Sequence, residues 1–183
     1  MDRDRVELSR LLRSRHHVIW LPTYEESYAL SLVREAAMDQ RRRLSIWSAS
    51  RGVHEGLLEK GEVAPGTMGA ATALQHWAGA DDAAICVALD IASHLEEPAP
   101  HRAMRDLLRH LEQTGAHLVL IDHADRLPPA IAAHSARLEL SLPDEAELEK
   151  LVVEGLRRAN RQSPIRILTR RDGILAVARS LRG

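Results

Sequence analysis

Short apolar runs alternate along this chain with longer stretches in which apolar residues recur every three or four positions. The runs have the length of buried strands, and the stretches between them have the periodicity of amphipathic helices. Four runs occupy residues 17–21, 44–48, 85–90 and 117–122, and a fifth, alternating segment occupies residues 136–142. Strands separated by helices are typical of a parallel sheet with helices on both faces, so the pattern predicts an α/β fold.

Helical periodicity first occurs near the N-terminus, where an apolar stripe among arginines predicts a short amphipathic helix. The members of this stripe are Val6, Leu8, Leu11 and Leu12. Thr23 and Glu26 have the spacing of a capping box, which predicts a helix that Thr23 caps and that runs to about residue 38. Further helices are expected over residues 67–78 and 101–114, from residue 144 onward and from residue 169 to the end.

Glycine and proline recur at short intervals between residues 52 and 69. Such turn-forming residues interrupt both helical and strand periodicity. We therefore expect a long irregular loop here, of the kind that is either functional or mobile.

Length and composition favour one main domain. The 183 residues suffice for an α/β domain over residues 1–143, and a helical segment over residues 144–183 is expected to pack on it. The net charge of −1 gives no overall attraction to nucleic acid or acidic membranes. The single cysteine, Cys86, lies within an apolar run, and no apolar run approaches the length that spans a bilayer. We expect a cytoplasmic protein without membrane contact.

The segment after the first strand is the first place to look for a ligand, because open parallel sheets bind ligands beyond the carboxyl ends of their strands. A nucleotide-binding P-loop at this position needs glycines, a lysine and a hydroxyl that reaches magnesium. Pro22, Thr23, Tyr24, Glu25 and Glu26 stand there instead. Glu25 and Glu26 suit the start of a helix but repel phosphate. The sequence therefore predicts that this chain does not bind and hydrolyse ATP by itself.

Two further strands end in a carboxylate. Asp90 occupies the position of a Walker B aspartate, but Ile91 follows it in place of the glutamate that positions an attacking water. Asp122 ends the next strand, and acids at strand ends commonly accept hydrogen bonds from loops. With His94 and His123, the two aspartates also have the chemistry of a divalent-metal site. A metal-dependent hydrolase built on Asp90 and Asp122 is therefore the alternative function.

Four segments, taken in order, carry a resemblance to a known family: VIWLPTYEE at 18–26, SIWS at 45–48, VALD at 87–90 and LELSLPDE at 138–145. Together they resemble the N-terminal, degenerate domain of bacterial and plastid AAA-family ATPases, which lacks the Walker A loop. The resemblance implies a P-loop NTPase-like three-layer sandwich, a five-stranded parallel sheet of order 5-1-4-3-2 and C-terminal helices of a partial lid. It also implies that ATP and magnesium belong to a separate catalytic module.

The chain departs from this family after Asp90 and in its glycine-rich segment, residues 52–69, which is unusual for the family. Residues 91–94 follow Asp90 where family members usually have an aromatic residue and a proline. Asp122 stands where such ATPases usually keep a neutral polar sensor.

The expected function is that of a non-catalytic docking or regulatory module. Its partner is expected to be another protein or a C-terminal AAA module, with no cofactor of its own, and assembly into a homo-oligomer stays open. A third interpretation assigns the arginines of residues 3–15 and 41–43 to one basic face for nucleic acid. We do not expect that partner, since interleaved acidic residues weaken the positive field.

Overall fold

The computed structural model describes residues 2–14, 16–58, 61–80, 83–141 and 145–162, together with residues 173 and 176. The chain divides into two compact units, Asp2–Leu140 and, with Met1, Ser141–Gly183. The second unit holds helix α6 (Glu145–Gln162). The helix predicted from residue 169 lies almost wholly outside the described residues. That residues 144–183 pack on the α/β domain stays a prediction.

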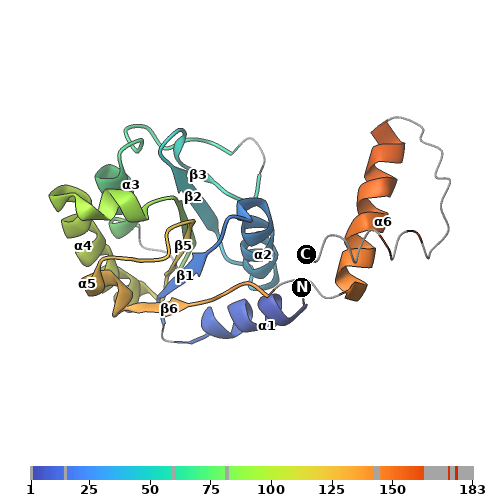
Figure 1. The fold of residues 1–183 in the computed structure, drawn as a ribbon. Coiled ribbons are helices and arrows are strands. Elements are labelled where there is room, and N and C mark those ends of the chain that lie inside the picture. Colours follow the sequence, from blue (N-terminus) through green and yellow to red (C-terminus); the bar gives the residue numbers. More distant parts are fainter. Residues whose placement is uncertain are drawn as a thin grey trace. The chain divides into compact units, whose positions relative to one another are not determined.

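A six-stranded sheet forms the middle layer of the first unit (Figure 1). Its strands are β1 (Val18–Pro22), β2 (Leu44–Ser48), β3 (Gly52–Glu55), β4 (Ile85–Leu89), β5 (His117–Asp122) and β6 (Ser135–Arg137). They lie in the order β3-β2-β4-β5-β1-β6, and every neighbouring pair is parallel except β2 and β3. The five parallel strands follow the predicted order. The sheet itself is mixed and six-stranded, because β3 adds an antiparallel edge that the sequence did not predict.

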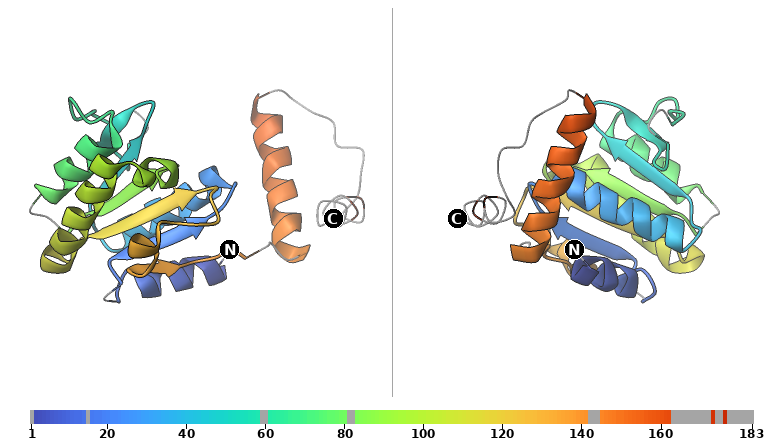
Figure 2. Two further views of the ribbon diagram at one scale, coloured as in Figure 1. Left: turned by 60° about the vertical axis from the view of Figure 1, so that its left-hand side comes forward. Right: turned by 90° about the vertical axis from the view of Figure 1, so that its right-hand side faces the viewer.

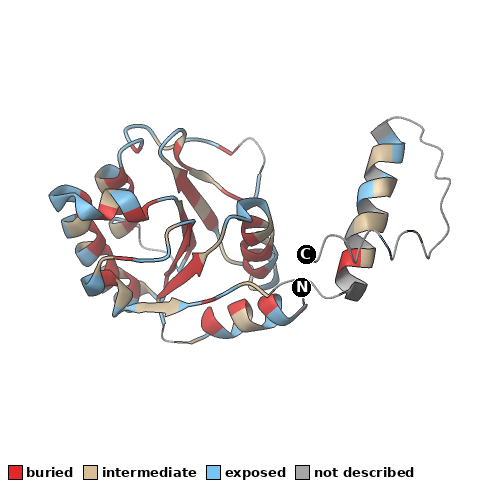
Figure 3. Ribbon diagram, viewed as in Figure 1, coloured by how far each residue is buried: buried red, intermediate tan, exposed pale blue. Residues whose placement is uncertain are grey.

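Helices cover both faces of this sheet (Figures 1 and 2). One face carries α1 (Asp2–Leu11) and α2 (Glu26–Asp39), and the other carries α3 (Ala70–Ala78), α4 (Pro98–Thr114) and the short α5 (Pro129–Ala132), while the 3-10 helix η1 (Ala92–Glu96) leads from β4 into α4. Successive residues of β1 pack into opposite cores, Val18 and Trp20 on one face and Ile19 and Leu21 on the other. Burial on both faces explains why the central strands are continuously apolar (Figure 3).

None of the helices in the described part of the chain combines the length and the apolar character needed to cross a bilayer.

The apolar stripe predicted for the N-terminal helix α1 is buried at three of its four positions. Leu8, Leu11 and Leu12 are buried, whereas the side chain of Val6 is 68% exposed. Asp4 lies inward instead, and the Tyr28 hydroxyl donates a 2.9 Å hydrogen bond to its carboxylate. A buried carboxylate is tolerated here because it is hydrogen-bonded.

The glycine-rich segment is more ordered than the predicted irregular loop, which is wrong for residues 52–55. Gly52 has a φ of +76° and opens β3, which pairs with β2. The buried Thr67 hydroxyl accepts a hydrogen bond from the Val53 amide (2.8 Å) and donates one to the Ala64 carbonyl (2.6 Å). The Trp47 indole N–H donates to the Thr67 carbonyl over 2.9 Å. Thr67 thereby ties the end of the segment to the sheet.

The edge strand is shorter and lies earlier than predicted: it spans Ser135–Arg137, whereas the alternating pattern covers residues 136–142 and the family resemblance implies residues 138–142. It pairs in parallel with Val18–Trp20 of β1, and the Leu138 amide then donates to the Trp20 carbonyl over 2.8 Å. The next bond of this ladder needs an amide hydrogen from Pro22, which proline lacks. The ladder therefore ends at Leu138.

Candidate functional site

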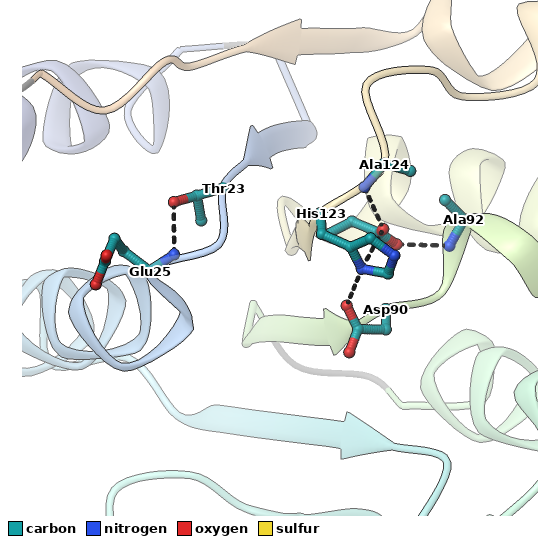
Figure 4. Close-up of polar contacts among 7 residues, drawn as sticks. Thr23, Glu25, Asp90, Ala92, His123 and Ala124 are labelled. Atoms are coloured by element: carbon teal, nitrogen blue, oxygen red, sulfur yellow. Dashed lines mark hydrogen bonds and ion pairs between the residues drawn. The ribbon is translucent and has the colours of Figure 1, made fainter.

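The connection from β1 to α2 holds only Thr23, Tyr24 and Glu25. The Thr23 amide donates to the Asp122 carbonyl over 2.8 Å, which continues the pairing of β1 with β5 by one more residue. The Thr23 hydroxyl then accepts a 3.0 Å hydrogen bond from the Glu25 amide (Figure 4). Helix α2 begins at Glu26, and no side-chain hydrogen bond caps it. The predicted capping box is wrong, because the bond to Asp122 holds Thr23 in line with the strand.

This connection differs from a P-loop in its length and in its hydrogen bonds. A P-loop spans about eight residues from its first glycine to its final hydroxyl, and its amides are free to point at phosphate. Here three residues close the gap, and the amides of Thr23 and Glu25 are already hydrogen-bonded. Tyr24, Glu25 and Glu26 are exposed, so the surface at this position is aromatic and acidic.

Asp122 is buried beneath this edge, with 2% of its surface exposed. One carboxylate oxygen accepts a 2.7 Å hydrogen bond from the Ala92 amide, and the other accepts a 2.9 Å bond from the Ala124 amide (Figure 4). Ala92 follows β4 and Ala124 follows β5, so the one side chain connects the loops after two neighbouring strands. Asp122 thus acts as an acceptor for loop amides.

Asp90 and His123 form an exposed pair above Asp122. Asp90 comes directly after β4 and has a φ of 51°, an uncommon value for a residue other than glycine. Its carboxylate lies 3.1 Å from Nδ1 of His123, while the nearer Asp122 oxygen lies 3.8 Å from the same nitrogen. The hydrogen bond with Asp90, aided by the charge of Asp122, raises the pKa of His123. The pair therefore favours a protonated imidazole.

Three of the four predicted metal ligands come together. Among the described residues, Asp90, Asp122 and His123 each offer one ligand atom, and these atoms all lie within 4.8 Å of one another. His94 takes another place, because its ring lies 5.8 Å, edge to face, from the ring of Trp47. Two carboxylates and one imidazole suit a divalent cation in their chemistry. A cation would have to compete with the His123–Asp90 hydrogen bond and share Asp122 with two amides.

At the amino ends of the strands, opposite the candidate site, lies Arg42, a charged residue whose role the sequence did not reveal. The guanidinium of Arg42 donates to the carbonyls of Ala83 (2.6 Å), Ala84 (2.9 Å) and Gly115 (3.1 Å). Its Nη1 also lies 3.0 Å from Nδ1 of His117. Arg42 is therefore half-buried and held by hydrogen bonds, whereas the neighbouring Arg41 and Arg43 are exposed. No spacing or motif in the sequence marks this residue, since the carbonyls that it binds are distant in the chain.

Burial lowers the pKa of His117 to about 4, and the charge of Arg42 and then of His17 adds to this effect. The His17 ring lies 5.3 Å from that of His117, and its Nδ1 is 3.0 Å from the Ala116 carbonyl. These contacts hold the amino ends of β1 and β5 together.

The sheet order, the helices on both faces and the strand-end aspartates define a P-loop NTPase-like α/β domain, with a short acidic turn between β1 and α2. The chain belongs to a particular family of this class, the "SpoVK-like AAA ATPase, N-terminal domain", whose model matches residues 4–140. The resemblance inferred from sequence is thereby confirmed.

Solved structures with the same fold are AAA+ proteins of low sequence identity. A single-substitution variant of RuvB from Thermotoga maritima is 12% identical with a TM-score of 0.58, over 97% of this chain and 55% of that one. PCH-2 of C. elegans is 10% identical with a TM-score of 0.57, over 99% and 58%. AMPPCP-bound DnaA from Aquifex aeolicus is 13% identical with a TM-score of 0.54, over 94% and 55%. This chain thus spans little more than half the length of these structures, and no curated protein matches its sequence.

Proposed function

We propose that this chain is a non-catalytic docking or regulatory module of an AAA-family ATPase and that it does not hydrolyse ATP itself. Its partner in this role is a catalytic AAA module or another protein. Family membership supports the AAA context, and the site supports the absence of catalysis.

The β1–α2 connection is the observation that carries the proposal. Its three residues are too few for a P-loop, and two of its amides are already bonded to Asp122 and Thr23. The carboxylate of Glu26 lies in the first turn of α2, where a bound phosphate would otherwise take advantage of the helix dipole. Length, hydrogen bonding and charge all oppose nucleotide binding at this edge.

Calorimetric titration of the chain with ATP and magnesium tests this proposal. We expect no binding up to millimolar ATP, and we expect the same for a variant with Glu25→Gly and Glu26→Lys, because the connection remains too short. Binding of ATP by the natural chain at micromolar concentration would contradict the proposal. A docking role further predicts that a catalytic AAA module binds this chain. The ATPase rate of that module should differ between the bound and the free state.

The alternative function is a metal-dependent hydrolase, which the approach of Asp90, Asp122 and His123 favours. In that case the two carboxylates and the imidazole hold a divalent cation, and the cation activates a water for hydrolysis. A ligand that binds only the folded state raises the melting temperature. A rise with Mg²⁺, Mn²⁺ or Zn²⁺ that disappears in Asp90→Asn would support the hydrolase, and an unchanged melting temperature would count against it.

A further inference from the structure

Two adjoining hollows on the α4 side of the domain form one furrow. The first, of about 300 Å³, is lined by Arg102, Arg105, Leu108, Arg109, Glu112, Ala130 and His134. The second, of about 230 Å³, is lined by His16, His17, Leu108, Glu112, His134 and Ser135 among others. Leu108, Glu112 and His134 line both hollows, so the two adjoin along α4. One wall of this furrow is α4, and the other comes from α5 and the start of β6.

The furrow has a cationic end and an imidazole end above an apolar floor. Arg102, Arg105 and Arg109 recur at helical spacing and line the first hollow, with the buried Leu108 between them. Asp106 pairs with Arg102 over 2.8 Å and also with Arg109, so it holds both guanidinium groups in place. Arg105 has no ion-pair partner among the described residues. Its charge is therefore available to a ligand.

The furrow and the carboxyl-end site occupy different parts of the domain. Helix α4 follows β4 and η1, runs back along the sheet and ends at Thr114, just before β5 starts at its amino end. The furrow follows this helix to His16 and His17, which precede the amino end of β1. Arg102 and Glu112 are ten residues apart on α4, so this part of the furrow is about 15 Å long. That length accommodates four or five residues of an extended peptide, at roughly 3.3 Å per residue.

We propose that this furrow binds an extended acidic segment of a partner protein, with carboxylates against the arginines. The inference rests on the proposed docking role and names the chemistry of the partner. Glu112 decides between this ligand and a nucleic acid, because it lies in both hollows. A phosphodiester chain carries one charge per nucleotide and brings a phosphate close to Glu112. A peptide places acidic side chains at the arginine end and a neutral or basic residue opposite Glu112.

Fluorescence anisotropy with a short labelled peptide rich in aspartate and glutamate tests the furrow. We expect the natural chain to bind this peptide at low ionic strength, and to bind a peptide with glutamine and asparagine in place of the acids far more weakly. Arg105→Glu should weaken binding about fivefold or more, since it replaces an attraction by a repulsion. The matched control is Arg13→Glu, which reverses an exposed charge on the chain just after α1 and should leave the affinity unchanged.

Four outcomes would overturn the inference: no binding of the acidic peptide, equal binding of the neutral peptide, full affinity in Arg105→Glu, or tighter binding of a single-stranded oligonucleotide of equal charge. Circular dichroism verifies that both variants fold. The two proposals fail separately. If the peptide does not bind but a catalytic AAA module still does, the furrow is wrong and the docking role stands. ATP binding at micromolar concentration with intact peptide binding would overturn the non-catalytic role alone.

Discussion

Arg42 and His117 meet at the amino end of the sheet, where Nη1 of the arginine lies 3.0 Å from Nδ1 of the imidazole. A guanidinium can only donate, so the imidazole accepts through Nδ1 and carries its hydrogen on Nε2. Protonation of Nδ1 would place two donors against each other. The contact is therefore compatible only with a neutral His117.

Acid should destabilise the domain through His117. The folded-state pKa is about 4, whereas the unperturbed value is 6.5. The unfolded chain therefore binds the proton first as the pH falls, and the free energy of unfolding decreases between pH 6.5 and pH 4, by about 3 kcal/mol at most. Urea unfolding at several pH values measures this decrease. His117→Gln keeps an acceptor for Arg42 and should have a visibly flatter profile; an identical profile would exclude His117 as the source.

Replacing the carboxylate of Asp122 by a neutral amide should destabilise the domain. Asp122→Asn replaces one of the two acceptors with an amide group, which then faces a backbone N–H. A buried donor without a partner costs about 2 kcal/mol. Asp90→Asn is the matched control, since Asp90 is exposed and should cost little. Equal unfolding midpoints for the two variants in urea would refute the proposed link between the loops.

The pKa of His123 should depend on Asp90. The hydrogen bond with Asp90 is the largest cause of the raised value, so Asp90→Asn should bring the pKa of His123 back toward 6.5. Titration of the imidazole resonances by NMR measures the change directly. Asp125→Asn, a substitution of an exposed acid in the following loop, is the control and should change the pKa less. A pKa unaffected by Asp90→Asn would mean that the pair does not persist in solution.

Gly52 should tolerate alanine less well than Gly66, although both have a positive φ, +76° and +75°. A methyl group at Gly52 would lie 2.9 Å from the Thr67 hydroxyl, whereas one at Gly66 would meet no atom within 4 Å. Gly66→Ala should therefore cost only the backbone strain, about 1 kcal/mol, and Gly52→Ala about twice that or more. Thermal unfolding compares the two. If Gly66→Ala were the more damaging, the role of Thr67 as an anchor would be wrong.

The pattern of apolar residues was sufficient to predict the central strands of the parallel sheet, whereas their order was implied by the family resemblance. The runs that contain Ile19, Val87 and Val119 are apolar on both faces, and only a sheet covered on both sides buries such strands. The carboxylates after them were equally visible, since Asp90 and Asp122 follow the apolar runs directly. The structure brings both to the same edge, as parallel strands require.

The remaining features depend on contacts between residues that are distant in the chain. Thr23 has the right neighbours for a cap, but its amide donates to the carbonyl of Asp122, ninety-nine residues further along the chain, and no capping bond forms. From the sequence, Val53 is predicted to lie in a loop. In the structure its amide donates to the hydroxyl of Thr67, fourteen residues away. In the sequence Arg42 resembles an ordinary surface arginine. The carbonyls that it binds, those of Ala84 and Gly115, lie just before β4 and β5 and are distant in the chain. His94 lies four residues after Asp90, yet it turns toward Trp47.

The three-residue passage from β1 to α2 also limits how this domain can evolve. A wrong side chain can be reversed by one substitution, but a P-loop here requires the insertion of about five residues. Such an insertion must also release the Thr23 amide from Asp122, whose own side chain supports the loops after β4 and β5. Chains with only part of the insertion would lose hydrogen bonds that stabilise the fold before they could bind phosphate. Point mutations alone therefore cannot create a phosphate cradle between β1 and α2.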